Sequence, residues 1–145
     1  MAKLNMVKAL NLALLQEMER DDDIVIIGED VGVDGGVFRV TEDLHRKFGG
    51  KRVIDSPLAE AGIIGTAVGM ALYGLKPVCE IQFSGFAFQC FHQIENHCAR
   101  FRTRTQSRFH IPMVIRMPYG GGVRALEHHS ESEELEILAN VLPIF

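Results

Sequence analysis

The chain has 145 residues, which is enough for one hydrophobic core and too few for two ordinary domains. Its apolar content of 47% and charged content of 23% are typical of a globular protein in water, and no apolar run is long enough to span a bilayer. The net charge of −4 disfavours a dedicated nucleic-acid or anionic-membrane binder.

Short apolar segments alternate with helical patterns along the chain. In chain order, the predicted elements are a helix from its cap Asn5 to about Glu19, a strand over residues 24–28, a loop over 31–36, a short extended segment over 37–40, a short helix from its cap Thr41 to about Phe48, a strand over 52–55, a helix over about 57–73, a strand over 76–83, a helix over about 86–104, a strand over 113–117 and a loop over 118–134. This alternation predicts an α/β fold in which a parallel sheet carries helices on both faces.

Ligands of such sheets bind outside the carboxyl ends of the strands. Here those ends carry polar residues at Glu29 and Asp30, at Asp55 to Glu60, at Gln82 to Phe86 and in the loop after Met117. The sequence therefore predicts a functional site at this edge of the sheet. It has no G-x-G-x-x-G after a strand, no Walker A segment and no G-x-S-x-G, so no motif supports a nucleotide-binding or serine-hydrolase interpretation.

Glu60 lies near a predicted helix start. Ser56 is expected to cap this helix and Pro57 to take its first position, so a capping-box acid would stand at residue 59, which is alanine. One interpretation of Glu60 is a surface acid favoured by the helix dipole. The other is a largely buried carboxylate, because its neighbours are apolar or small. A buried carboxylate needs a partner or a raised pKa, and both suit acid–base chemistry.

Three glycines follow Glu60 on the same predicted helix, at Gly62, Gly65 and Gly69. Each costs the helix up to about 1 kcal/mol relative to alanine. Close approach of another helix would offset this cost, either inside the chain or between subunits.

The histidines are candidate functional groups, since imidazole titrates near neutral pH. His128 and His129 stand among acidic residues, but adjacent histidines project differently and no third ligand has a diagnostic spacing, which disfavours a metal site. A loop with one working histidine is favoured instead. His92 and His97 are five residues apart on a predicted helix and are expected to point to different faces.

The cysteines are odd in number, at Cys79, Cys90 and Cys98, and form no C-x-x-C. Free thiols in a reducing compartment are expected. The amino-terminal MAKLNMVKAL has no apolar signal region and no cleavage site. The predicted location is the cytoplasm, or the mitochondrial matrix in a eukaryote.

Several segments together resemble a known family. They are, in order, VKALNLAL, IIGEDVG, GGVFRVT, RVIDSPLAEAGIIGTAVGMAL, GLKPVCEIQF, IPMVIRMPYGGGVR and HHSES. The resemblance covers roughly residues 4–132 and is to the beta subunit of the thiamine-diphosphate-dependent 2-oxoacid dehydrogenases, the decarboxylating components of the pyruvate and branched-chain complexes.

The resemblance implies a role for six residues. Glu60 matches the glutamate that hydrogen-bonds N1′ of the cofactor's aminopyrimidine, a contact that makes the cofactor its own base. His129 matches the histidine that serves the active centre during acyl transfer to lipoamide. The positions implied to lie at or near the pyrimidine are Glu29, Leu58, Gln82 and Phe86, of which Glu29 is expected in a proton relay.

The resemblance also implies partners. Thiamine enzymes hold the diphosphate through magnesium bound by a Gly-Asp-Gly motif, and this sequence has none. The diphosphate and magnesium are therefore expected on an alpha subunit, within a heterotetramer. A second beta subunit is expected to pack on the helix with Gly62, Gly65 and Gly69, and the lipoyl domain of the acyltransferase to dock at the active centre.

The expected organisation is one pyrimidine-binding domain over residues 1–145, without the second, carboxyl-terminal domain of the family. Residues from about 135 to 145 depart from the family pattern. An alternative function therefore stays open, that of a truncated, catalytically inactive interaction domain with the same fold.

Overall fold

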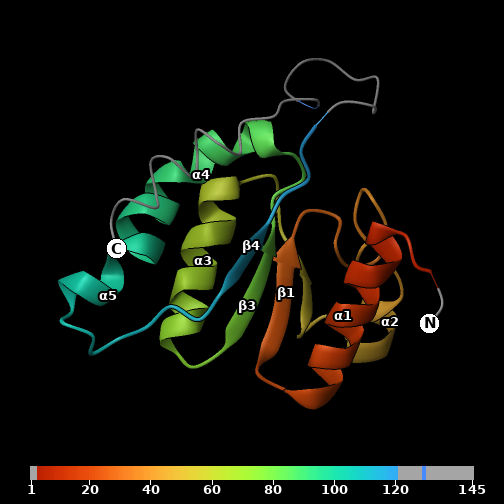
Figure 1. The fold of residues 1–145 in the computed structure, drawn as a ribbon, viewed down its shortest axis with the longest axis horizontal. Helices are drawn as coiled ribbons and strands as arrows, with labels where there is room; N and C mark the ends of the chain where they lie inside the picture. The colour runs from red at the N-terminus through yellow and green to blue at the C-terminus, as the bar shows by residue number, and fades with distance from the viewer. Residues whose placement is uncertain (1–2, 121–128, 130–145) are drawn as a thin grey trace.

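The computed structural model describes residues 3–120 and His129, which form a four-stranded sheet flanked by helices (Figure 1). In chain order, the elements are α1 (Met6–Arg20), β1 (Ile24–Gly28), α2 (Leu44–Phe48), β2 (Val53–Asp55), α3 (Glu60–Leu72), β3 (Lys76–Glu80), the 3₁₀ turn η1 (Ser84–Phe86), α4 (Ala87–Gln93), the π-helix η2 (Ile94–Ala99), α5 (Phe101–Arg104) and β4 (Val114–Arg116). The predicted α/β class is confirmed.

All strand pairs are parallel and the strand order is β2-β1-β3-β4. In the register, Gly28 at the end of β1 stands beside Asp55 of β2 and Glu80 of β3, and Glu80 stands beside Arg116 of β4. The polar residues at the carboxyl ends of the four strands are thus brought to one edge of the sheet.

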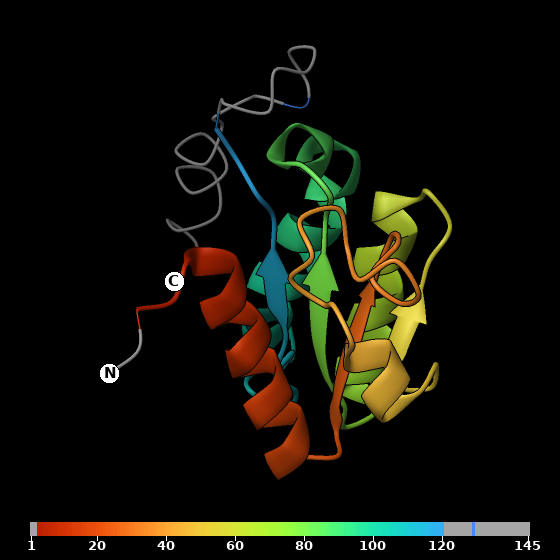
Figure 2. The same cartoon turned by 90° about the vertical axis from the view of Figure 1, so that its right-hand side faces the viewer.

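Each face of the sheet has its own hydrophobic core. Ile27 and Cys79 pack with Ile63 and Ile64 of α3 and with Cys90 of α4 on one face. On the other face, residues of α1 and α2 pack against β1 and β2, and the buried members of this cluster are Met18, Ile26, Val31, Leu44 and Val53. Figures 1 and 2 show α3 and α4 on one side of the sheet and α1 and α2 on the other. Among the described residues, no helix is both long and apolar enough to cross a bilayer.

The turn between α1 and β1 is held by Arg52, just before β2. Asn5 caps α1 as predicted, with its side chain accepting a hydrogen bond from the Lys8 N–H at 2.9 Å. At the other end of α1, the Arg52 guanidinium donates to the carbonyl groups of Met18, Asp21 and Ile24 at 2.8–3.1 Å. The same guanidinium lies 5.0 Å from the centre of the Phe48 ring. One side chain therefore joins α1, β1, α2 and β2.

The start of α3 differs from the prediction. The helix begins at Glu60, with Ala59 as an N-cap that makes no side-chain capping bond, and it does not begin at Pro57. The Ser56 N–H instead donates to the Gly28 carbonyl at 2.8 Å, and its hydroxyl donates to the Pro57 carbonyl at 2.9 Å. Ser56 thus extends the strand ladder, and the chain needs residues 57–59 to turn into the helix.

Two further predictions between β1 and β2 are wrong. Residues 37–40 form turns and not an extended segment. Thr41 does not cap α2, because its buried hydroxyl donates to the Val31 carbonyl at 2.7 Å. The helix begins at Leu44, after Asp43 in the left-handed conformation. Thr41 therefore closes the loop that begins at Val31.

The long helix predicted over residues 86–104 is present as consecutive turns of different kinds, in which α4 passes into the π-helix η2 and then into α5. This change corrects the expectation for His92 and His97. Their ring centroids lie 5.6 Å apart in an edge-to-face contact, so the two side chains meet.

The glycines of α3 are unequally surrounded. A side chain at Gly65 would meet Gln93 of α4 at 3.6 Å, so α4 approaches α3 closely at this position. Within the described part of the chain, a Cβ atom added at Gly69 would meet nothing within 4 Å, and one added at Gly62 would meet only the Cβ of Ala59 at 3.5 Å. A packing role for Gly62 and Gly69 inside the described chain is therefore wrong, and contact with another subunit stays a prediction.

Candidate active site at the carboxyl edge of the sheet

Glu60 is the first residue of α3 and only 3% of its surface is exposed. The buried interpretation of this residue is therefore confirmed. Its Oε2 atom is buried without a hydrogen-bond partner among residues 3–120 and 129. The position at a helix amino terminus favours negative charge. An unpartnered buried oxygen costs on the order of 1–3 kcal/mol, so Glu60 is suited to accept or share a proton with a group that enters the site.

Glu29 directly follows β1 and is also buried, with 7% of its surface exposed. Burial raises the pKa of its carboxyl, and the negative charges of Glu60 and then Asp30 raise it further. A hydrogen bond from the backbone N–H of Ala59 opposes this rise. The negative charge of Glu60 therefore acts on Glu29, the other carboxyl group predicted from the sequence.

Gln82 lies just beyond β3 and bridges to the end of β1. Its Nε2 donates to Asp30 Oδ2 at 2.9 Å. Asp30 has a φ of 55°, and its carbonyl accepts the Gly36 N–H at 2.7 Å, which ties the following loop back onto the strand end. Gln82 is thus positioned by the same loop that carries Glu29.

An aromatic cluster lies after β3 and includes His129. The His129 ring centroid is 4.7 Å from that of Phe83 and 5.3 Å from that of Phe86, both edge to face. Phe38 completes the cluster at 5.7 Å from Phe83. The structure therefore brings two predicted site residues, Phe86 and His129, together. His128 lies outside the described residues.

Leu58 is the predicted site residue that the described chain leaves exposed. It lies between β2 and α3, and 77% of its surface is accessible. Leu58 therefore makes no buried contact with the other candidate residues in the described part of the chain.

Three residues at this edge were not predicted as site residues. Phe83 is one, although the segment Gln82 to Phe86 was predicted to lie at this edge. The other two are Glu80 and Arg116, which form a salt bridge with side chains 2% and 17% exposed. Burial raises the pKa of Glu80, whereas the charge of Arg116 and the hydrogen bond from it lower this pKa. The sequence feature that could have indicated this pair is a charged residue at the end of each of two apolar strands, Glu80 in β3 and Arg116 in β4.

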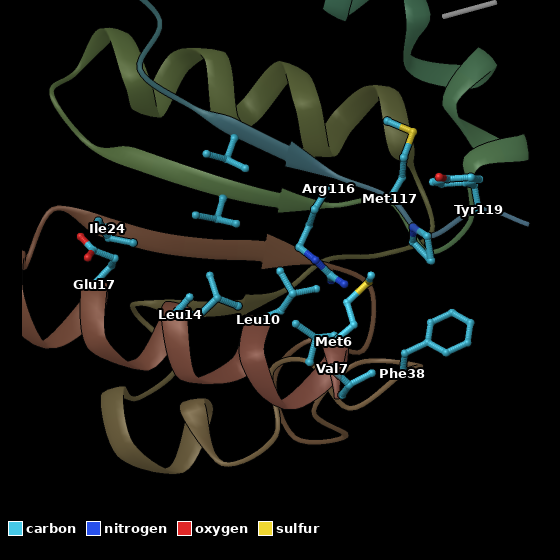
Figure 3. A pocket seen from close by; sticks show the side chains of 15 residues that line it. Met6, Val7, Leu10, Leu14, Glu17, Ile24, Phe38, Arg116, Met117 and Tyr119 are labelled. Atoms are coloured by element: carbon cyan, nitrogen blue, oxygen red, sulfur yellow. The ribbon is translucent and has the colours of Figure 1, made fainter. Parts of the chain in front are cut away.

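A cavity of about 570 Å³ lies elsewhere, between α1 and strands β3 and β4 (Figure 3). Its wall is mostly apolar and includes Leu10, Leu14, Val78 and Val114, with Arg116 at one side. None of the site residues predicted from the sequence lines this cavity, although Phe38 of the aromatic cluster and Arg116 at the sheet edge do.

The three cysteines are free. Burial raises the pKa of Cys79 and Cys90 to about 12 and that of Cys98 to about 11. Thiols with such values stay protonated at neutral pH and are poor nucleophiles. Among the described residues, no group of three histidine, cysteine or acidic side chains is arranged to hold a metal ion.

Comparison with known proteins identifies the family. Residues 2–140 match the family described as "Transketolase, pyrimidine binding domain". The chain is 52% identical over 143 residues to the pyruvate dehydrogenase E1 component subunit beta of Acholeplasma laidlawii. The aligned region covers 99% of this chain and 43% of that protein. It is 52% identical over 131 residues to the 3-methyl-2-oxobutanoate dehydrogenase subunit beta of Mycobacterium tuberculosis, covering 90% of this chain and 38% of that protein.

A solved structure shares the fold. A chain described as "Split gene transketolase, inactive beta4 tetramer" superposes with a TM-score of 0.67 at 20% identity, covering 90% of this chain and 38% of that chain. The present chain thus spans about two fifths of the length of the proteins that it matches. It belongs to the transketolase pyrimidine-binding domain family, and over that domain it is similar to the beta subunits of 2-oxoacid dehydrogenases.

Proposed function

We propose that the chain is the pyrimidine-binding domain of a 2-oxoacid dehydrogenase beta subunit. In this proposal it takes part in decarboxylating pyruvate or a branched-chain 2-oxoacid on thiamine diphosphate and in transferring the acyl group to lipoamide. The names of the similar proteins support the reaction class. The observation that carries the proposal is the unpartnered Oε2 of Glu60, buried at the start of α3.

The residues present fit the pyrimidine end of the cofactor. A ring nitrogen that shares a proton with Glu60 Oε2 would remove the cost of leaving that buried oxygen without a partner. When bound, thiamine diphosphate supplies a nucleophilic carbon for attack on the 2-oxoacid carbonyl. Glu60 would hold the proton at N1′ of the aminopyrimidine, and the amino terminus of α3 would favour its charged form.

Glu29 would act behind Glu60 as the next group in a proton relay. Burial and then the charge of Glu60 raise the pKa of Glu29, which suits Glu29 to hold a proton near Glu60. Gln82, Phe86 and Leu58 would surround the pyrimidine ring. Exposed Leu58 then needs cover from the ring or from another subunit, since fully burying a leucine gains about 1.5–3 kcal/mol.

His129 would serve acyl transfer to the lipoyl domain of the acyltransferase. Its contacts with Phe83 and Phe86 fix the imidazole beside the proposed ring site, where it can donate or accept a proton. A single-turnover assay separates this step from decarboxylation. His129→Ala is expected to impair reductive acylation of lipoamide, and a variant unimpaired in both steps would remove His129 from the site.

Two partner chains follow from the proposal. An alpha subunit would bind the diphosphate and its magnesium ion, because this sequence has no Gly-Asp-Gly. A second beta subunit would pack against α3, where Gly62 and Gly69 lie exposed and leave room for close helix contact. The assembly would be a heterotetramer in the cytoplasm.

A second candidate function is a non-catalytic interaction domain. It is favoured by the exposed Gly62 and Gly69 of α3, which leave room for another chain and need no cofactor to do so. Size-exclusion chromatography and a thiamine diphosphate titration, each with and without an alpha subunit, distinguish the two. Cofactor binding only in the mixed complex supports the enzyme. Self-association with no cofactor response in either sample supports the interaction domain.

A further inference from the structure

We propose that His92 and His97 form a two-histidine chelating site for a divalent transition metal ion such as zinc. The site lies where α4 passes into η2, and it does not depend on the proposed enzymatic function. Among residues 3–120 and 129 the two imidazoles are the protein ligands, so water would fill the other coordination positions.

The distance between the rings suits chelation. The centroids of His92 and His97 are 5.6 Å apart. Two imidazoles that bind one tetrahedral zinc ion at Zn–N distances of about 2.0–2.1 Å have centroids about 5 Å apart. The ring planes are inclined by 79°, so chelation requires side-chain rotations that turn one nitrogen of each ring toward the ion. His92 is exposed and His97 is half-buried, so one ligand is anchored while the other remains open to solvent.

The π-helix creates this proximity. Two residues that are five positions apart on a regular α-helix point in directions about 140° apart. An α-helix would therefore direct His92 and His97 away from one another. The helix instead takes the π form over Ile94–Ala99, whose wider turns bring such residues onto one side. Short π segments inside helices are frequently found at functional sites. Metal bound by the pair would hold the π form in place.

The surroundings favour a transition metal over magnesium or calcium. The two side chains of η2 that carry oxygen both accept hydrogen bonds from Arg100, Glu95 at 2.6 Å and Asn96 at 3.0 Å. Neutral imidazole nitrogens suit zinc, copper and nickel, whereas magnesium and calcium prefer oxygen ligands.

The test is isothermal titration of the untagged 145-residue chain with zinc chloride at neutral pH. The expected result is a site of micromolar affinity. Because a chelate needs both ligands, His92→Ala and His97→Ala should each weaken zinc binding at least tenfold. His110→Ala, which removes another exposed histidine, should change the affinity less than twofold. Magnesium chloride should give no binding at this site.

Circular dichroism without metal checks that each variant is folded, and a variant that unfolds is replaced by the corresponding glutamine substitution. Zinc binding by the wild type weaker than millimolar would overturn the proposal. So would unchanged affinity in either the His92 or the His97 variant, since one imidazole alone does not make a chelate.

Discussion

Replacing Arg116 by alanine leaves the carboxylate of Glu80 buried without its charged partner. Glu80 is 2% exposed and Arg116 is 17% exposed, so solvent screens the pair weakly. Removing one member of a buried ion pair costs about 3–5 kcal/mol. For a chain of this size, each kcal/mol lowers the melting temperature by roughly 3–4 °C, so Arg116→Ala should lower it by about 10 °C or more.

The pH dependence identifies the cause. Burial raises the folded-state pKa of Glu80 above its unfolded value, and Arg116 opposes this rise. Without Arg116, ionised Glu80 costs more stability at neutral pH, and the cost falls as the pH decreases through the raised pKa. Urea unfolding at pH 7.5 and at pH 5 should therefore show a smaller difference between wild type and Arg116→Ala at pH 5. Adding Glu80→Gln to the variant should restore part of the loss at pH 7.5.

A matched control uses an exposed ion pair. Arg20 lies 2.7 Å from Glu17, and both side chains are more than half exposed. Such pairs contribute about 0–1 kcal/mol, so Arg20→Ala should change the free energy of unfolding by less than that. A loss below 1 kcal/mol for Arg116→Ala, or a loss that does not change with pH, would refute a buried and charged Glu80.

Three further predictions concern the fold. Glu29→Gln should raise the free energy of unfolding in urea at pH 7.5 and raise it less at pH 5. The reason is that the raised pKa of Glu29 makes its charged form costly only at the higher pH. A lower free energy of unfolding for the variant at pH 7.5 would contradict this prediction. A thiol reagent should modify Cys98 before Cys79 and Cys90 in the folded chain, and all three should react quickly only in denaturant, because burial raises their pKa values to about 11 to 12. Rapid modification of all three in the folded chain would contradict this prediction. Arg52→Lys should lower the free energy of unfolding by about 1–3 kcal/mol, because lysine lacks the planar guanidinium that donates to the carbonyl groups of the turn after α1. The exposed control Lys51→Ala should lower it by less than about 0.5 kcal/mol. Equal losses in thermal unfolding would argue against the role of these hydrogen bonds.

The sheet was predictable because its strands are short apolar runs with clear ends. Residues 24–28 are apolar and close with glycine, and the structure places β1 over the same residues. The strands predicted around 52–55, 76–83 and 113–117 are present but shorter. The place of the polar residues at one edge then follows from parallel pairing alone.

Local helix boundaries were less predictable because tertiary hydrogen bonds compete with capping. Serine and threonine are residue types that often cap helices, yet the Ser56 N–H donates to the Gly28 carbonyl and the Thr41 hydroxyl donates to the Val31 carbonyl. The π-helix was likewise hidden, because residue spacing was interpreted with an α-helical period and no local sequence feature marked the change. This single difference reversed the relation between His92 and His97.

Part of the candidate site was predictable from position along the chain. Glu29, Glu60 and Gln82 follow strands or open a helix, so topology alone placed them at one edge. The residues that hold the edge together were harder to find. Glu80 and Arg116 belong to different strands, and their pairing depends on the order of β3 and β4, which a single sequence does not specify.

Decarboxylation by the Glu60→Gln variant tests the proposed function most directly. The chain is combined with an alpha subunit, thiamine diphosphate and magnesium, and turnover of pyruvate and of a branched-chain 2-oxoacid is measured beside the exposed control Glu42→Gln. Loss of the group that holds the proton at N1′ should lower turnover at least about 100-fold while assembly with the alpha subunit is kept. Near-normal turnover of an assembled Glu60→Gln complex would contradict the account.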